Sequence, residues 1–163
     1  MNPTIRGANS GDIPDIQSLY RQLDDHHADL IPEVFQPLDW NARADCDIQE
    51  AIDREDMEYL VAICDEKVVG FVQLEIAIQP DFPVFRPREY ALMDSAVVDK
   101  PYRRKGIGRM LCKAAVEWCR ARGTPQIQTN VWDKNVGARE FYLDFGFRPM
   151  CVKLELDIGG IEI

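Results

Sequence analysis

The feature that most constrains the fold is a strand–loop–helix junction in the middle of the chain. Tyr90–Val98 is an apolar run that predicts a strand, and apolar residues at helical spacing over Ile107–Cys119 predict an amphipathic helix. The motif Arg103-x-x-Gly106-x-Gly108 lies between them. Two glycines let backbone N–H groups turn toward one point, and the helix N-terminus adds free donors and partial positive charge. The junction therefore predicts a loop that binds an anion such as a pyrophosphate.

Two common phosphate-binding motifs do not fit this loop. A P-loop requires Lys followed by Ser or Thr after its last glycine, whereas Gly108 is followed by Arg109 and Met110. The dinucleotide fingerprint requires a third glycine, and Leu111 occupies that position. The anion is therefore expected to belong to another class of ligand.

The order of the expected elements around the junction indicates a mixed α/β fold. A helix begins after Asn9, which can cap it, and an irregular segment spans Asp24–Asn41. The order reads βα(α)ββ and then βαβαβ, which we interpret as a single domain over residues 1–163 with its core in 4–157. The expected strands are Thr4–Ala8, Tyr59–Cys64, Val68–Ile78, Tyr90–Val98, Ile127–Val131 and Met150–Ile158.

A second motif lies about thirty residues after the first, Asn135-x-x-Ala138-x-x-Phe141-Tyr142-x-x-x-Gly146-Phe147. Together the two motifs and the order of elements resemble the GNAT superfamily of N-acetyltransferases over nearly the whole chain. The resemblance implies a mostly antiparallel sheet with a βαβ unit that binds acetyl-CoA. It also implies transfer of an acetyl group from acetyl-CoA to a primary amine, by direct attack in a ternary complex and without a metal.

The resemblance also implies where the cofactor binds. The pyrophosphate is expected on the N–H groups of the glycine loop, and the pantetheine arm alongside Ala96 and Val98 like an added strand. A backbone N–H near Ala96 or Val97 is expected to stabilise the oxyanion, while Asn135 contacts the cofactor or caps its helix. The residues assigned to acetyl-CoA are Ala96, Val97, Val98, Arg103, Arg104, Lys105, Gly106, Ile107, Gly108, Arg109 and Asn135.

Tyr142 is the residue that we assign to proton donation. Attack on the thioester expels a thiolate, and a phenol held near the sulfur can protonate it. The alternative is a tyrosine that only packs beside Phe141 on an apolar helix.

The general base is left open between three candidates. Glu75 and Asp94 lie on expected strands, and a water chain ending at His26 or His27 is the third. Some family members carry a glutamate five residues before the motif asparagine, but Asn130 occupies that position and cannot act as a base. We assign His26, His27 and Asn130 to the acceptor side of the site.

Charge is unevenly distributed along the chain. The net charge is −9, residues 12–58 carry fourteen acids and three bases, and residues 100–109 carry five bases and no acid. The acidic balance disfavours a nucleic-acid module, which only the basic loop supports. The acidic section favours a cationic small amine as acceptor. A protein or peptide amine, or an acyl-CoA sensor without catalysis, remains as an alternative.

The remaining composition is that of an ordinary intracellular protein. Five cysteines without a C-x-x-C pair and two adjacent histidines predict neither disulfides nor a metal site. The apolar runs are far shorter than the ~20 residues that cross a bilayer, and the N-terminus has no apolar signal region. We therefore expect a cytoplasmic location without membrane attachment. Apolar residues of Met150–Ile158 could serve a homodimer or an internal strand face.

Overall fold

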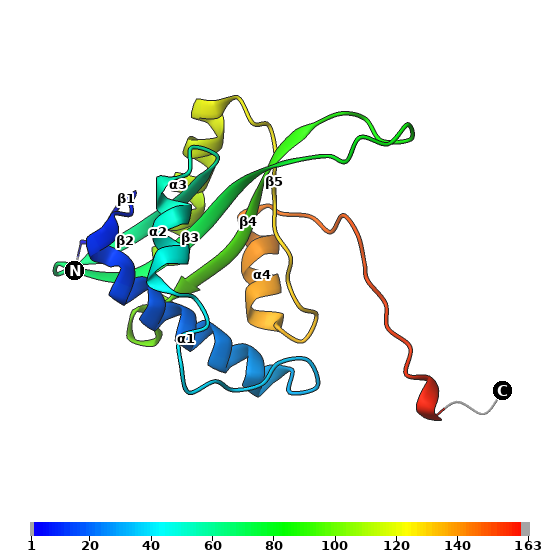
Figure 1. Ribbon diagram of the computed structural model, residues 1–163, viewed down its shortest axis with the longest axis horizontal. Helices are drawn as coiled ribbons and strands as arrows, with labels where there is room; N and C mark the ends of the chain where they lie inside the picture. Colours follow the sequence, from blue (N-terminus) through cyan, green and yellow to red (C-terminus); the bar gives the residue numbers. More distant parts are fainter. Residues whose placement is uncertain (1, 161–163) are drawn as a thin grey trace. The chain divides into compact units, whose positions relative to one another are not determined.

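The computed structural model describes residues 2–160 and contains two compact units, Met1–Asn130 and Val131–Ile163. The first unit carries a five-stranded sheet of order β1-β2-β3-β4-β5, whose strands are labelled in Figure 1. The first four strands pair antiparallel. Strand β5, which is connected to β4 through helix α3, pairs parallel with β4. The expected mostly antiparallel sheet with a βαβ unit is thus confirmed. The strands are β1 (Thr4–Gly7), β2 (Met57–Cys64), β3 (Lys67–Ile78), β4 (Glu89–Val98) and β5 (Ile127–Gln128).

Helices α1 (Ile13–Leu30) and α2 (Asp45–Asp53) pack on one face of this sheet. Their apolar residues share a buried cluster with Tyr59, Val61 and Phe71 of the strands. In Figure 1, α2 lies in front of the strands and α3 (Ile107–Arg122) behind them. The apolar stripe of α3 is buried, as its periodicity predicts.

The start of α1 follows from short-range hydrogen bonds. The Asn9 side chain accepts from the Gly11 N–H at 2.9 Å, and Asp12 accepts from the Asn9 N–H at 2.8 Å. Asn9 thus caps a short 3₁₀ turn, Ser10–Asp12, that runs directly into α1, and the predicted cap is confirmed. Arg6 also donates two hydrogen bonds to Asp12, at 2.6 and 2.8 Å. The irregular segment expected from Asp24 was wrong in its first part. The helix continues to Leu30 because no residue breaks it before Pro32.

The second unit contains α4 (Val136–Phe145), which ends at Gly146 with φ +120°. The predicted strand Met150–Ile158 was wrong, because 150–157 has no regular structure and 158–160 is a short 3₁₀ turn. The segment has the alternation of a strand, but a strand also needs a hydrogen-bonded neighbour. The strand expected at Ile127–Val131 shortens to Ile127–Gln128 for the same reason, since only Ala91 and Leu92 pair with it.

Within residues 2–160 no helix combines the length and the apolar character that a membrane span requires.

Candidate functional site

The glycine loop has the backbone geometry of an anion-binding turn. After a short 3₁₀ turn, Arg104 and Gly106 adopt left-handed conformations with φ +61° and +85°, and α3 begins at Ile107. The first N–H groups of a helix have no partner within it, so those of α3 are presented at the loop. The buried Asp99 accepts from Gln22 Nε2 at 2.9 Å and anchors the start of the loop to α1.

The edge of β4 that leads into this loop is open. In the part of the chain that the structure describes, β5 pairs only with Ala91 and Leu92, near the other end of β4. The Asp99 N–H donates to the Val69 carbonyl of β3 at 2.9 Å. Backbone groups alternate in direction along a strand, so those of Ala96 and Val98 point away from β3. The Val98 carbonyl accepts from Arg103 Nε at 2.8 Å, so the main-chain groups of Ala96 and the Val98 N–H are those that an extended amide-bearing ligand can join.

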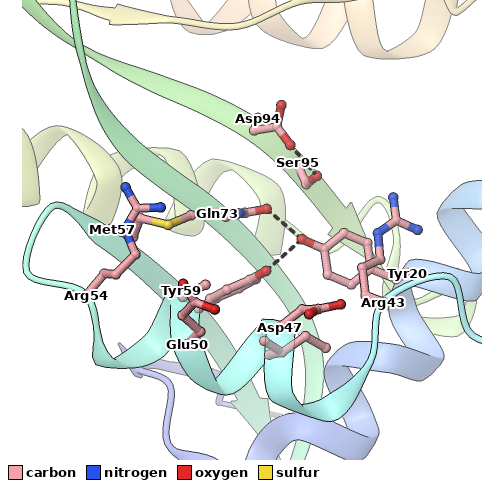
Figure 2. A pocket seen from close by; sticks show the side chains of 12 residues that line it. Tyr20, Arg43, Asp47, Glu50, Arg54, Met57, Tyr59, Gln73, Asp94 and Ser95 are labelled. Atoms are coloured by element: carbon pink, nitrogen blue, oxygen red, sulfur yellow. Dashed lines mark hydrogen bonds between the residues drawn. The ribbon is translucent and has the colours of Figure 1, made fainter.

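A cavity of about 370 Å³ opens on the α1 and α2 side of the first unit. Figure 2 shows its side chains converging from helices α1 and α2, the segment between them, and the three central strands. A β-bulge lies at its wall: Gln73 pairs with Ser95 and Leu74 with Met93, which leaves Asp94 without a partner. The lining residues are Tyr20, Arg43, Asp47, Ile48, Glu50, Ala51, Arg54, Met57, Tyr59, Gln73, Asp94 and Ser95.

Two buried tyrosines form a hydrogen-bonded chain beside this cavity. The Tyr20 hydroxyl donates to Gln73 Oε1 at 2.6 Å and lies 2.9 Å from the Tyr59 hydroxyl. Burial raises the pKa of both phenols above the usual value, so both are neutral hydrogen-bonding groups at pH 7. Ser95 Oγ donates to Asp94 Oδ2 at 3.3 Å on the facing strand.

The cavity has an excess of uncompensated carboxylates. Arg43 pairs with Asp24, and Arg54 pairs with Asp56 at 2.7 Å and with Glu75 at 3.1 Å; none of these three acids lines the cavity. The lining acids are Asp47, Glu50 and Asp94, and no ion pair involves them among residues 2–160. A cationic ligand would therefore be attracted to this cavity.

The structure separates the candidates for the general base. Asp94 lines the cavity, whereas Glu75 lies outside it and holds Arg54. His26 and His27 occupy the second half of α1 and do not line the cavity. His27 stacks on Phe35 with a centroid distance of 5.0 Å, and burial lowers its pKa. Asn130 is exposed and follows β5.

Asn135 and Tyr142 belong to the second unit. Asn135 caps α4, accepting from the Ala138 N–H at 3.3 Å, which confirms the capping role. The Tyr142 ring packs against Phe141 and Phe147, with centroids 5.4 and 5.3 Å apart. Their roles toward acetyl-CoA stay predictions.

Several lining residues were not expected from the sequence. In the sequence, Tyr20 is one apolar position of a predicted helix, and Arg43 lies in a segment without a motif. Gln73, Tyr59 and Ser95 are single polar positions on strands. None carries a local signal, because only strand pairing and the packing of α1 and the following segment on the sheet bring them to one cavity.

Solved structures of low sequence identity share this architecture. A point mutant of the BH1408 protein from Bacillus halodurans superposes with a TM-score of 0.90 at 24% identity, covering 95% of this chain and 99% of that one. The aminoglycoside N-acetyltransferase AAC(6')-Iy, solved with CoA, superposes with a TM-score of 0.73 at 15% identity, covering 97% and 95%. These similarities establish an acetyltransferase-type fold.

The family itself is established by sequence. The model of the acetyltransferase (GNAT) family matches residues 19–147, and the chain belongs to this family. Its members are acyltransferases that use acetyl-CoA. An uncharacterized N-acetyltransferase, MJ1207 of Methanocaldococcus jannaschii, is 28% identical over 148 residues, which are 88% of this chain and 60% of the relative. The L-ornithine N5-acetyltransferase NATA1 of Arabidopsis thaliana is 32% identical over 82 residues, 50% of this chain and 34% of the relative. The chain thus spans less than two thirds of either relative.

No group of three or more metal-ligating side chains is found among residues 2–160.

Proposed function

We propose that this protein is an N-acetyltransferase that moves an acetyl group from acetyl-CoA to a primary amine of a cationic small molecule. The observation that carries the proposal is the arrangement along β4. Asp94 and Ser95 line the cavity, Ala96 and Val98 present the open edge, and the anion-binding loop follows directly. One strand thus joins a site for the amine to a site for the thioester.

Acetyl-CoA binding is assigned to the loop and the open edge. The pyrophosphate is held by N–H groups between Arg104 and Arg109, and the pantetheine amides pair with Ala96 and Val98. Arg103 Nε donates to the Val98 carbonyl at 2.8 Å, which fixes the end of the edge beside the loop. Asn135 of the second unit is the further cofactor contact.

The reaction proceeds by direct attack in a ternary complex. Asp94 removes a proton from the ammonium group, and the amine nitrogen then forms a bond to the thioester carbonyl carbon. The oxyanion is stabilised by the backbone N–H of Ala96, which points away from β3, whereas that of Val97 faces β3. The carbon–sulfur bond then breaks, and Tyr142 protonates the departing thiolate. The new amide nitrogen loses its remaining extra proton, which restores the Tyr142 phenol. Asp94 is favoured over Glu75 as base because it lines the cavity and has no cationic partner there.

The carboxylates of the cavity support a cationic acceptor. The similar L-ornithine N5-acetyltransferase and the structurally similar aminoglycoside N-acetyltransferase are named for acceptors that carry amino groups. A protein N-terminus or a lysine side chain would suit the same charge. Turnover of basic peptides compared with small amines distinguishes these two classes of acceptor.

The test is release of CoA thiol from acetyl-CoA over a panel of amines, with acetyl-CoA affinity measured by calorimetry. Tyr142→Phe is expected to lower kcat about 100-fold at unchanged acetyl-CoA affinity, the loss typical of a general acid. Tyr90→Phe, which removes a hydroxyl from β4 away from the cavity, is the matched control. Binding without turnover on any amine or basic peptide would favour an acyl-CoA sensor. Failure to bind acetyl-CoA would sink the proposal.

We further propose a homodimer that buries the apolar residues of the 150–158 segment. Five alternating residues there are at least two-thirds exposed, Met150, Val152, Leu154, Leu156 and Ile158. Sedimentation of Leu154→Asp is compared with that of Glu155→Gln. Only Leu154→Asp removes apolar surface, so only this variant is expected to shift the protein from dimer to monomer. A wild-type protein that sediments as a monomer at high concentration would contradict the dimer. The cytoplasmic location expected from the cysteine pattern stays a prediction.

A further inference from the structure

The orientation of one side-chain amide in the cavity is determined by the tyrosine chain. The Tyr20 hydroxyl has a single proton, which it donates to Gln73 Oε1 at 2.6 Å. The Tyr59 hydroxyl, 2.9 Å from that of Tyr20, must therefore donate to Tyr20. Both tyrosines are buried, 4% and 3% exposed, so water does not compete for these bonds. The chain of donors thus ends on the amide oxygen.

The amide nitrogen of Gln73 is consequently turned away from Tyr20. Oxygen and nitrogen lie on opposite branches of a planar amide, and Gln73 lines the cavity. Figure 2 shows the Gln73 oxygen directed at the Tyr20 hydroxyl, with the side chain at the centre of the lining. Gln73 pairs with Ser95, next to the bulge at Asp94. The two N–H donors of the Gln73 amide therefore lie outside the tyrosine chain, on a residue that lines the same cavity as Asp94.

Arg43 adds further donors to the same cavity. Its guanidinium lies 4.2 Å above the Tyr20 ring, and one of its terminal nitrogens binds Asp24. The Arg43 carbonyl accepts from Gln17 Nε2 at 3.0 Å, which holds the backbone of this segment against α1. A guanidinium has five N–H groups, so donors remain after the bond to Asp24. The stacked, paired group is held in place and is suited to binding a carboxylate.

We propose that Gln73 is a specificity-determining residue that, with Arg43, binds a carboxylate of the acceptor. The inference rests on the proposed function and narrows its substrate class to amines that also carry a carboxylate, such as diamino acids. The reacting amine lies at Asp94, and the carboxylate is bound by the oriented amide and the guanidinium. A diamine without the carboxylate leaves these donors without a ligand partner. A site built to hydrogen-bond one group discriminates strongly against an analogue that lacks it.

The test uses acceptor pairs that differ only by the carboxylate. L-Lysine is compared with cadaverine, and 2,4-diaminobutyrate with propane-1,3-diamine. The wild-type protein is expected to show a kcat/KM at least about tenfold higher for the amino acid of the better pair. This comparison needs no variant, so it holds whatever the variants do to folding.

A substitution at Gln73 supplies the second arm. Gln73→Glu keeps the shape and the oxygen that accepts from Tyr20, but it removes the N–H donors and adds a negative charge. It is expected to lower kcat/KM for the amino acid about tenfold or more, through KM, while the diamine is unaffected or improved. Gln36→Glu places the same charge on an exposed residue outside the lining and is expected to change neither.

The possible results separate this inference from the proposed function. Equal or better turnover of the diamines overturns the carboxylate site while the acetyltransferase proposal stands. The carboxylate site is also overturned if Gln73→Glu lowers kcat/KM equally for both members of a pair. The same holds if the protein turns over only amines that are neither diamino acids nor diamines. Absence of turnover on every amine refutes the proposed function and the carboxylate site together.

Discussion

Gly70 lies where a single added carbon should disturb both the sheet and the proposed cofactor edge. Gly70 of β3 pairs with Val98 of β4, the last residue before the turn into the glycine loop. A Cβ atom added to Gly70 would lie 2.9 Å from the Val97 oxygen and 3.3 Å from the Val98 Cα. Both are main-chain atoms and cannot rotate aside, so in Gly70→Ala the end of β4 must move.

The cost can be bounded from these contacts. Overpacking by one methyl group typically destabilises by about 1–3 kcal/mol. The loss of backbone freedom in the unfolded chain offsets about 0.4–1 kcal/mol of this. The net loss lies between about 0 and 2.6 kcal/mol. Its middle, about 1–2 kcal/mol, corresponds to a melting temperature about 2–8 °C lower for a chain of this size. Because Val97 and Val98 border the proposed pantetheine edge, acetyl-CoA affinity should fall as well.

Thermal unfolding followed by circular dichroism, together with acetyl-CoA calorimetry, measures both effects. Gly137→Ala is the matched control, because its Cβ meets nothing within 4 Å and the residue lies in α4. The control is expected to be neutral or stabilised by up to about 1 kcal/mol. A Gly70→Ala melting temperature at or above that of the wild type would refute the steric argument. A lower melting temperature with unchanged acetyl-CoA affinity would refute only the link to the cofactor edge.

Three further predictions follow from local geometry. Gly106→Ala should weaken acetyl-CoA binding several-fold by calorimetry, because a φ of +85° costs a non-glycine residue about 1 kcal/mol; unchanged affinity would show that the loop does not need this conformation. The Arg6 guanidinium lowers the pKa of Asp12, so this pair stabilises the fold above the unfolded-state pKa of about 3.9, and the contribution is lost as pH falls through the lower folded pKa. The stability gap between wild type and Asp12→Asn in urea unfolding should therefore be about 1 kcal/mol at pH 7 and shrink at pH 2–3, and a pH-independent gap would contradict the ion pair. Burial raises the pKa of the Cys112 thiol to about 11, and Cys46 and Cys151 are the exposed cysteines. A thiol reagent at pH 8 should therefore label Cys46 and Cys151 quickly in the folded protein and all five cysteines in denaturant. Rapid labelling of all five without denaturant would argue against the buried positions.

Features that depend on neighbours in sequence could be predicted from the sequence alone. The Asn9 cap, the glycine that ends α3 and the turn at Gly106 involve hydrogen bonds or dihedral angles within a few residues. The order of strands and helices as far as α4 followed from hydrophobic periodicity. The two motifs then indicated the family, which the match over residues 19–147 established.

The cavity depended on contacts that no local pattern encodes. Tyr20, Arg43, Gln73 and Asp94 lie on four different segments, and a register shift of β4 against β3 leaves Asp94 unpaired at the wall. The sequence contains Tyr20 and Gln73 fifty-three positions apart, and their hydrogen bond exists only because α1 packs on the sheet. Alternation at Met150–Ile158 likewise predicted a strand, but a strand forms only with a partner ladder. Local chemistry thus determined the loop and the caps, whereas long-range packing decided which polar groups meet in the cavity.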